Sequence, residues 1–302
     1  ADYKVIYDLN GGTKTSVSTE FDGLQYGTAT PLISDPTRKD DAIAKNYKFI
    51  GWKDKDSESK ELGVADTVTR NTTYVAQWKC DKIPYKVTYE LEGGTSQTDP
   101  GKDIISYSQE YGTPITQIKV PEKTGYVFTM WTIGTSTEKA DTTGNVTKDI
   151  TFTAHWEPGT GTTFHVEHYL QNLSNPDTYV KQDGDEKYNG KTDSTVTAAA
   201  YVRSYTGFTY NPSYKESVSS GQIAADGSFT LKLYYSRNTY TVTYQYTGDV
   251  PSGASALPAT ASYLYGTEVT TASPATAANY TFSGWSRTGT FVITQDTVIS
   301  GS

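Results

Sequence analysis

The chain has 302 residues and a formal net charge of −8, and it carries no basic patch. This charge argues against nucleic acid and anionic membrane surfaces as partners. No run of 18 apolar residues is present, so we expect no membrane insertion in this segment. A single cysteine, Cys80, excludes a disulfide framework within the chain.

One stretch recurs along the chain. Residues 3–12 read YKVIYDLNGG, residues 85–94 read YKVTYELEGG, and residues 240–246 read YTVTYQY, with a looser copy, FHVEHYL, at 164–170. Aromatic and β-branched residues alternate with polar ones, which predicts a half-buried strand with Tyr3, Val5 and Tyr7 on one face. The copies begin 82, 79 and 76 residues apart, so each opens a small domain of its own. The 25 tyrosines supply buried area that such small cores need.

The sequence therefore predicts four modules: residues 1–82, 83–158, 159–237 and 238–302. In the first, Asn10-Gly11 predicts a tight hairpin turn after the opening strand. Residues 37–45 are polar and predict one short helix. Residues 46–52 (NYKFIGW) predict a strand with Phe49 on one face and Trp52 on the other, and residues 72–78 (TTYVAQW) predict a closing strand.

The other modules repeat these landmarks in the same order. The Tyr-Gly-Thr step of residues 26–28 in the first module returns at 111–113 and 265–267. The aromatic stretch returns at 125–131 (GYVFTMW) and 279–285 (NYTFSGW). The third module is a more divergent copy. It has His168 where the others have tyrosine, and LKLYY at 231–235 is its closing strand. The short joints 79–84 and 236–238 are expected to limit bending. Because Ala1 directly precedes a strand and no closing tryptophan follows residue 300, we expect a segment of a longer protein.

These motifs resemble known families. The first two modules resemble the internalin B-repeat (Listeria-Bacteroides repeat) family, through the opening strand, Asn-Gly-Gly, Tyr-Gly-Thr, the aromatic-Gly-Trp step and the closing aromatic-x-Ala-x-Trp. The third is similar to the mucin-binding-protein (MucBP-like) repeats, through VEHYL at 166–170 and LKLYY at 231–235. The fourth again resembles the internalin type, but it lacks the glycine pair and inserts residues 251–258. The resemblance covers nearly the whole chain.

The resemblance implies a fold and a location. The fold would be mostly β (α+β), with tandem β-grasp, ubiquitin-like modules in an elongated array. The location would be extracellular, on the cell wall of a Gram-positive-type surface protein.

Few residues could carry chemistry. His165 and His168 point to opposite faces of a strand and His155 belongs to another module, so we expect no metal site at the three histidines. Cys80 is expected to be an incidental thiol in a linker. The acidic run 183–186 (DGDE) lacks the spacing of an EF-hand loop, and a solvated turn is the favoured interpretation over a weak calcium site. We expect no catalytic residue, no cofactor and no enzyme activity.

The five tryptophans allow two interpretations. Aromatic rings can stack on sugars, yet these five recur at fixed places in divergent modules, as core residues would. We expect a structural core role for all of them: Trp52, Trp78, Trp131, Trp156 and Trp285.

The expected function is a non-catalytic stalk or adhesin segment, a monomer that displays other domains and binds host mucin or matrix glycans or proteins. The first alternative is an ancillary glycan-binding region of a secreted enzyme, with the third module as binder. The second is a self-associating module that uses exposed strand edges.

Overall fold

The computed structural model describes residues 1–14, 18–182, 184 and 186–302. These residues form β-strands and one short 3₁₀ helix, without an α-helix. They divide into two compact units, Ala1–Glu122 with Phe128–His155, and Lys123–Val127 with Trp156–Ser302. The prediction of a mostly β chain is confirmed, although the α+β part of it finds no α-helix in the described residues, and the four module boundaries stay predictions. No helix in the described ranges has the length and apolar character needed to cross a bilayer.

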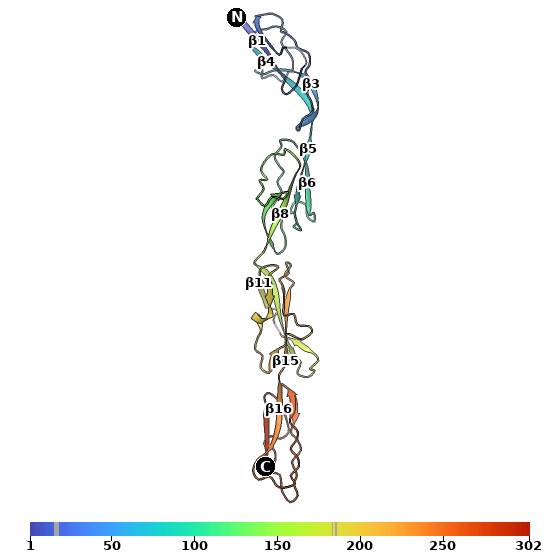
Figure 1. The fold of residues 1–302 in the computed structure, drawn as a ribbon, viewed down its shortest axis with the longest axis vertical. Coiled ribbons are helices and arrows are strands. Elements are labelled where there is room, and N and C mark those ends of the chain that lie inside the picture. Colours follow the sequence, from blue (N-terminus) through green and yellow to red (C-terminus); the bar gives the residue numbers. More distant parts are fainter. Residues whose placement is uncertain (15–17, 183, 185) are drawn as a thin grey trace. The chain divides into compact units, whose positions relative to one another are not determined.

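The first module is built around a mixed sheet with the strand order β2-β1-β4-β3 (Figure 1). Its strands are β1 (Asp2–Asp8), β2 (Glu20–Gln25), β3 (Ala44–Asp54) and β4 (Thr72–Lys82). The opening and closing strands, β1 and β4, form the central pair and run parallel, with Tyr7 beside Tyr74. The outer strands β2 and β3 pair antiparallel with them.

The second module repeats this arrangement in the order β6-β5-β8-β7. Its strands are β5 (Pro84–Glu90), β6 (Ile104–Glu110), β7 (Tyr126–Ile133) and β8 (Ile150–Pro158). Again the opening and closing strands, β5 and β8, pair in parallel. Two modules with different sequences thus share one topology.

The third and fourth modules keep the parallel pair of opening and closing strands, β9 with β15 and β16 with β20. The elements of the third are β9 (Thr162–Gln171), β10 (Tyr179–Lys181), β11 (Glu186–Gly190), β12 (Thr195–Thr197), the 3₁₀ helix η1 (Ala198–Tyr201), β13 (Phe208–Tyr210), β14 (Ser220–Gln222) and β15 (Thr230–Arg237). Those of the fourth are β16 (Thr239–Tyr246), β17 (Ala261–Leu264), β18 (Glu268–Thr270), β19 (Thr290–Val292) and β20 (Thr297–Gly301). Side pairs β12–β14 and β18–β19 complete them.

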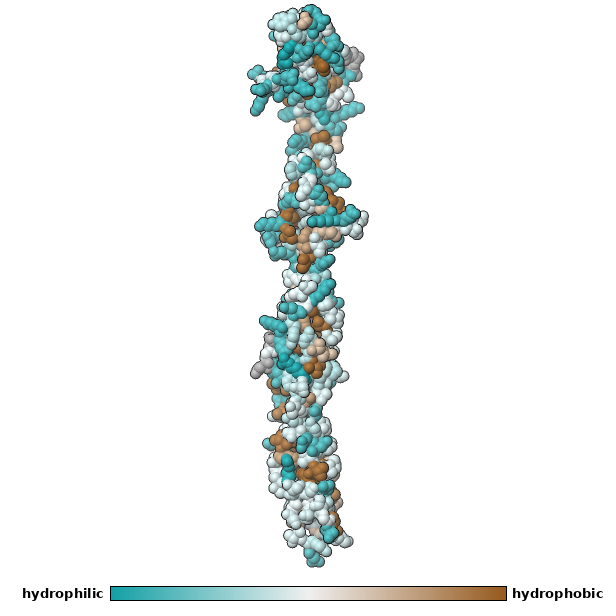
Figure 2. Space-filling view, turned by 90° about the vertical axis from the view of Figure 1, so that its left-hand side faces the viewer, coloured by the Kyte–Doolittle hydropathy of each residue, from teal (hydrophilic) through white to brown (hydrophobic). Residues whose placement is uncertain are grey.

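Each module has its own core on one face of its sheet. In the first, Val5 and Tyr7 are 1% and 2% exposed, which confirms the predicted alternation along the opening strand. Val87 and Tyr89 are likewise buried in the core of the second module. On the face drawn in Figure 2, hydrophobic residues form separate patches among hydrophilic ones. The cores thus bury large apolar side chains, and the apolar residues that remain on this face are scattered.

The predicted helix at residues 37–45 is wrong. The segment is a loop that leads into β3. The Asp41 carboxylate accepts the backbone N–H groups of Ile43 and Ala44, both at 2.9 Å, and Asp40 accepts that of Asn46 at 2.8 Å. Side chains that take backbone donors in this way compete with the hydrogen bonds of a helix, so the segment stays extended.

The predicted tight hairpin is only half right. Asn10 and Gly11 do form the turn, with φ of 47° and 79°. However, β2 begins only at Glu20, so the next strand does not follow the turn directly. Thr13 pairs instead with Thr37 in the connection before β3, because it lies beyond the end of β1. The turn therefore leads from β1 to the Thr13–Thr37 bridge and not directly into β2.

The prediction that Phe49 and Trp52 face opposite ways is also wrong. The pairing of β3 with β4 shifts register between Phe49 and Gly51, which leaves Ile50 as an extra residue. Such a bulge turns the following side chains over. Ile50 is 51% exposed, while the rings of Phe49 and Trp52 meet on the core side with centroids 5.1 Å apart. Gly51, at φ 140°, provides the backbone conformation that the bulge needs.

The joints are tighter than linkers. Strand β4 continues through the predicted joint to Lys82, so Cys80 lies on a strand, not in a linker as predicted. Ile83 alone separates β4 from β5, and Asn238 alone separates β15 from β16. At these two joints a single residue separates the last strand of one module from the first strand of the next, whereas residues 159–161 separate β8 from β9.

Candidate functional site

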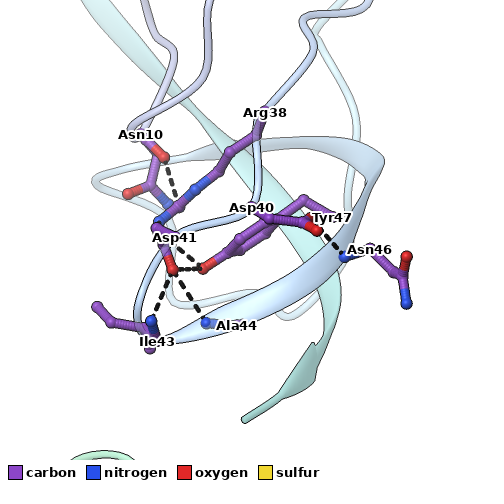
Figure 3. Close-up of polar contacts among 8 residues, drawn as sticks. All are labelled: Asn10, Arg38, Asp40, Asp41, Ile43, Ala44, Asn46 and Tyr47. Carbon is purple, nitrogen blue, oxygen red and sulfur yellow. Dashed lines mark hydrogen bonds and ion pairs between the residues drawn. The ribbon is translucent and has the colours of Figure 1, made fainter. Parts of the chain in front are cut away.

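A well-connected polar cluster surrounds Asp41 at the start of β3 (Figure 3). Besides the two backbone N–H groups, the carboxylate accepts the Tyr47 hydroxyl at 3.0 Å and the Arg38 Nη2 at 2.9 Å. These donors hold the pKa of Asp41 well below its usual range, and the Ala44 N–H contributes most. A carboxylate whose pKa is lowered in this way is a poor proton acceptor near neutral pH.

Arg38 ties the same cluster to the Asn-Gly turn. Its Nη1 donates to the backbone oxygen of Asn10 at 2.9 Å, and its guanidinium lies 4.1 Å from the centre of the Tyr47 ring. Figure 3 shows Arg38 lying between Asn10 and the Asp41 carboxylate. Every group in this cluster is thus engaged in fastening one loop to another, which is a structural clasp and not a catalytic arrangement.

Two of the three tryptophans in the aromatic stretches, Trp52 and Trp285, lie inside their modules. Trp52 is 7% exposed, with its ring 4.8 Å from that of Tyr7. Trp285 is also 7% exposed, with its ring 4.9 Å from that of Tyr244, and its Nε1 donates to the Ser273 carbonyl at 3.0 Å. Neither offers a free face for sugar stacking.

The other three tryptophans are half-buried. Trp78 packs against the first core and Trp131 against the second, where its ring lies 5.1 Å from that of Tyr89. Trp156 lies under the Lys123 ammonium, 5.8 Å from the ring centre. The predicted core residues thus occupy three situations: Trp52 and Trp285 are enclosed, Trp78 and Trp131 lie at the rim of a core, and Trp156 lies half-buried beside Lys123.

The histidines are not brought together. His155 contacts the Thr132 hydroxyl at 2.9 Å on the second sheet. His168 lies in the third core, where the Tyr235 hydroxyl is 3.0 Å from its Nδ1 and Glu186 lies 3.9 Å from its Nε2. Burial lowers the pKa of His168 more than Glu186 raises it, so the imidazole is neutral.

No cluster of three or more His, Cys, Asp or Glu side chains suited to a metal occurs within residues 1–14, 18–182, 184 and 186–302. Cys80 is a free thiol of intermediate exposure. Asp183 and Asp185 of the acidic run lie outside the described residues.

Sequence reasoning missed Arg237, the last residue of β15. It is 6% exposed, and its guanidinium donates to the carbonyls of Leu173 (3.1 Å), Leu264 (3.2 Å) and Tyr265 (2.5 Å) and to the Thr267 hydroxyl (2.8 Å). Burial lowers its pKa. One side chain of the third module therefore binds loops of both the third and the fourth. The signal in the sequence was an arginine at the end of an otherwise apolar and aromatic strand.

The third module also carries a tyrosine cluster on the sheet face opposite its core. It comprises Tyr169, Tyr179, Tyr214 and Tyr234. Tyr169 and Tyr234 stack with centroids 4.5 Å apart and planes 8° apart, and Tyr214 lies 4.6 Å from Tyr234. The Tyr234 hydroxyl donates to Glu216 at 3.2 Å. Tyr234 is 4% exposed, so the surface that a sugar can contact consists of the half-buried rings of Tyr169, Tyr179 and Tyr214.

Comparisons with known proteins agree with the repeats. The model of the Listeria-Bacteroides repeat domain matches residues 3–77, 85–155 and 240–300, which fall in the first, second and fourth modules. A protein of Evansella cellulosilytica named "Putative membrane protein" is 28% identical over 295 residues, 94% of this chain and 39% of the relative. Another, named "Putative Gly-rich membrane protein", is 30% identical over 159 residues, 51% of this chain and 16% of the relative. The chain thus spans well under half the length of both relatives.

Proposed function

The chain belongs to the Listeria-Bacteroides repeat domain family, and from this premise we propose that it is a non-catalytic stalk segment of a cell-surface protein. It displays other parts of that protein outside the cell, attached to the cell wall. The membrane-protein names of two relatives, both much longer than this chain, support a surface location. The chain acts as a monomer and needs no cofactor.

The observation that carries this proposal is the joint held by Arg237. A buried guanidinium satisfied by carbonyls of two modules fixes one against the other, because any hinge motion leaves charged donors without acceptors. Asn238 adds two backbone bonds, to Gly207 and from Tyr265, both at 2.8 Å. A spacer needs such stiffness, whereas an enzyme or a globular binder does not.

The joint between the first two modules is built differently and serves the same purpose. The Tyr85 hydroxyl donates to the Ala42 carbonyl at 2.7 Å, and the Lys82 ammonium lies 2.8 Å from Glu110. Ile83 donates to the Ile43 carbonyl at 3.2 Å. The first joint thus combines a continuous strand with cross-links on either side.

The fold proposal follows from topology. A sheet in the order 2-1-4-3 with a parallel central pair is that of the β-grasp fold, and we assign the first two modules to it, with loops in place of its helix. The third module, outside the matched ranges, is assigned to the MucBP-like repeats. The elongated array expected from the sequence stays a prediction.

Distance measurement between two modules tests the proposal. Spin labels at the exposed positions Lys215 and Gln295, in the full chain with Cys80→Ser, report the spread of distances across the Arg237 joint. We expect a narrow distribution in the parent and one at least about twice as wide in Arg237→Gln. The matched control is Arg287→Gln, an exposed arginine of the fourth module, which leaves the width unchanged. A parent as broad as the Arg237 variant removes the stalk proposal.

The tyrosine cluster supports a second candidate, glycan binding by the third module, as a stalk that also adheres or as part of a secreted enzyme. A glycan array with the full chain tests it. Tyr214→Ala is the informative variant, since Tyr214 lies in the connection after β13 and packs on the cluster without belonging to the core. Binding that survives Tyr214→Ala places the ligand elsewhere, and an array without any hit removes this candidate.

A further inference from the structure

Two tight turns that precede aromatic stretches are built alike. Residues 123–126 read KTGY and residues 205–208 read YTGF, so both contain the step Thr-Gly-aromatic. In each turn the backbone N–H of the fourth residue donates to the carbonyl of the first at 3.0 Å. The glycines, Gly125 and Gly207, have φ of 76° and 81°. Both turns belong to the second compact unit, and they are called the Gly125 turn and the Gly207 turn below.

The glycine carbonyl of each turn binds the chain where a closing strand has just ended. Gly159 is the first residue after β8, and its N–H donates to the Gly125 carbonyl at 2.8 Å. Asn238 is the first residue after β15, and its N–H donates to the Gly207 carbonyl, also at 2.8 Å. The Gly125 carbonyl additionally accepts the Thr192 hydroxyl at 2.6 Å. Both turns therefore hold the same position of the chain through the same atom.

Neither glycine has room for a side chain. A Cβ atom at Gly125 would lie 2.7 Å from the Cα atom of Ala225, and one at Gly207 would lie 2.3 Å from the Tyr265 ring. Carbon atoms in van der Waals contact are about 3.5–4.0 Å apart, so both positions are closed to a Cβ atom. Ala225 belongs to the third module and Tyr265 to the fourth. In both cases the module that follows the closing strand fills the space that a side chain would need.

The partner of each glycine is itself the second residue of a tight turn. Ala225 lies in a turn closed by a 2.9 Å hydrogen bond from the N–H of residue 227 to the carbonyl of residue 224. Tyr265 lies in a turn closed in the same way, at 3.1 Å, between residues 267 and 264. A turn therefore packs against a turn in both places, although the residues that meet differ greatly in size.

The first joint is made without such a turn. Asn46 stands before the aromatic stretch of the first module, with φ of 55°. Its backbone N–H donates to Asp40 at 2.8 Å, and its side-chain amide donates to Asp81 at 2.9 Å. The N–H of Ile83, the residue after β4, donates to the Ile43 carbonyl instead. An asparagine at this position thus accompanies a different kind of joint.

We propose that the Thr-Gly-aromatic turn is a docking surface that fits a tight turn of the following β module, and that Gly207 is the residue that lets the fourth module dock closely. This inference rests on the stalk proposal and identifies what sets the stiffness of its carrying joint. Gly207 provides access, because its missing Cβ atom leaves space for the partner turn. Arg237 then binds the carbonyls of Leu264 and Tyr265 in that turn.

The absent side chain, and not the backbone conformation, is what requires glycine here. The fourth module has an equivalent turn at residues 277–280, in which the Tyr280 N–H donates to the Ala277 carbonyl at 3.3 Å. The third residue of that turn is Asn279, with φ of 70°. Asparagine therefore adopts this backbone, and a change of Gly207 to asparagine adds a side chain while the turn itself is kept.

Spin labels at Lys215 and Gln295, in the full chain with Cys80→Ser, measure the effect of that change. We expect Gly207→Asn to widen the distance distribution at least about twofold, because the new side chain displaces the Tyr265 ring. The matched control is Gly289→Asn, where φ is 79° and no described heavy atom outside its chain neighbours lies within 4 Å of the new Cβ position. A narrow parent with an equally narrow Gly207→Asn variant overturns this inference alone, whereas a broad parent removes the stalk proposal beneath it.

Tyr265→Ala approaches the same contact from the fourth module and leaves the third module unchanged. We expect this variant to widen the distribution as well, while Tyr280→Ala, at a side chain 66% exposed in the same module, leaves it unchanged. Hydrogen exchange of β9 and β16 shows whether each module stays folded. If Gly207→Asn unfolds the third module, Tyr265→Ala decides, and a parent-like width then overturns the inference.

The Gly125 turn tests whether the docking surface is general. Gly125→Asn should speed exchange of the Gly159 and Thr192 amides at least about tenfold, because the first donates to the Gly125 carbonyl and the second to the Gly159 carbonyl. The control is Gly112→Asn, at φ 79° and likewise without a described neighbour within 4 Å, which should leave these amides unchanged. Parent-like exchange in Gly125→Asn overturns the proposal that the Thr-Gly-aromatic turn is a docking surface.

Discussion

Replacing Trp52 by alanine should strongly destabilise or unfold the first module. Trp52 is 7% exposed and meets the rings of Tyr7 and Phe49 at 4.8 and 5.1 Å. Loss of a buried aromatic side chain costs about 3–5 kcal/mol. A domain of this size is stable by about 4–12 kcal/mol, at roughly 0.05–0.15 kcal/mol per residue. The substitution therefore removes a quarter or more of the stability of the module and lowers its melting temperature by at least about 12 °C.

Hydrogen exchange in the full chain measures this effect locally. We expect amides of β4 (Thr72–Lys82) to exchange faster in Trp52→Ala, while those of the third module stay unchanged. The matched control is Ile50→Ala on the same strand, where a side chain 51% exposed at the bulge should cost no more than about 0.5 kcal/mol. Parent-like exchange in Trp52→Ala would refute the assignment of Trp52 to the core.

Three further predictions concern titration and metals. Because hydrogen bonds lower the pKa of Asp41, its contribution to stability is complete above its ordinary pKa of about 4 and is lost as pH falls below it; exchange at the start of β3 should quicken there in the parent but not in Asp41→Asn. Because burial lowers the pKa of His168, the third module should lose stability as pH falls below about 6.5, and denaturant melts at pH 7 and 5 should differ in the parent but not in His168→Gln. EDTA should leave the melting temperature unchanged, and a fall that calcium restores would contradict this and indicate a site at the acidic run 183–186.

The strands could be predicted from the sequence because their signal is local. The alternation of Val5 and Tyr7 needs no knowledge of the rest of the chain, and it was right. The face of Trp52 was not predictable in this way. It depends on an extra residue, Ile50, which is defined only by pairing with a strand some 25 residues further along. A period of two fails wherever a bulge intervenes.

Predictions for the polar residues failed for a related reason, because their partners are not evident from the local sequence pattern. Residues 37–45 have a composition compatible with a helix. However, the Asp41 carboxylate accepts the backbone N–H groups of Ile43 and Ala44. Arg237 reads as a solvated joint residue, yet its acceptors lie 64 residues before it and 28 residues after it.

The parallel pairing of first and last strands has a mechanical consequence. In the first module β1 receives the chain and β4 passes it on, and the two lie side by side in the same direction. Tension applied between Asp2 and Lys82 pulls these strands past each other, so their hydrogen bonds are loaded together in shear. An antiparallel hairpin pulled at its open end is instead peeled one bond at a time. The same parallel pairing recurs in β5–β8, β9–β15 and β16–β20. In every module, tension along the chain therefore loads the hydrogen bonds of this pair in shear, the geometry in which they resist most.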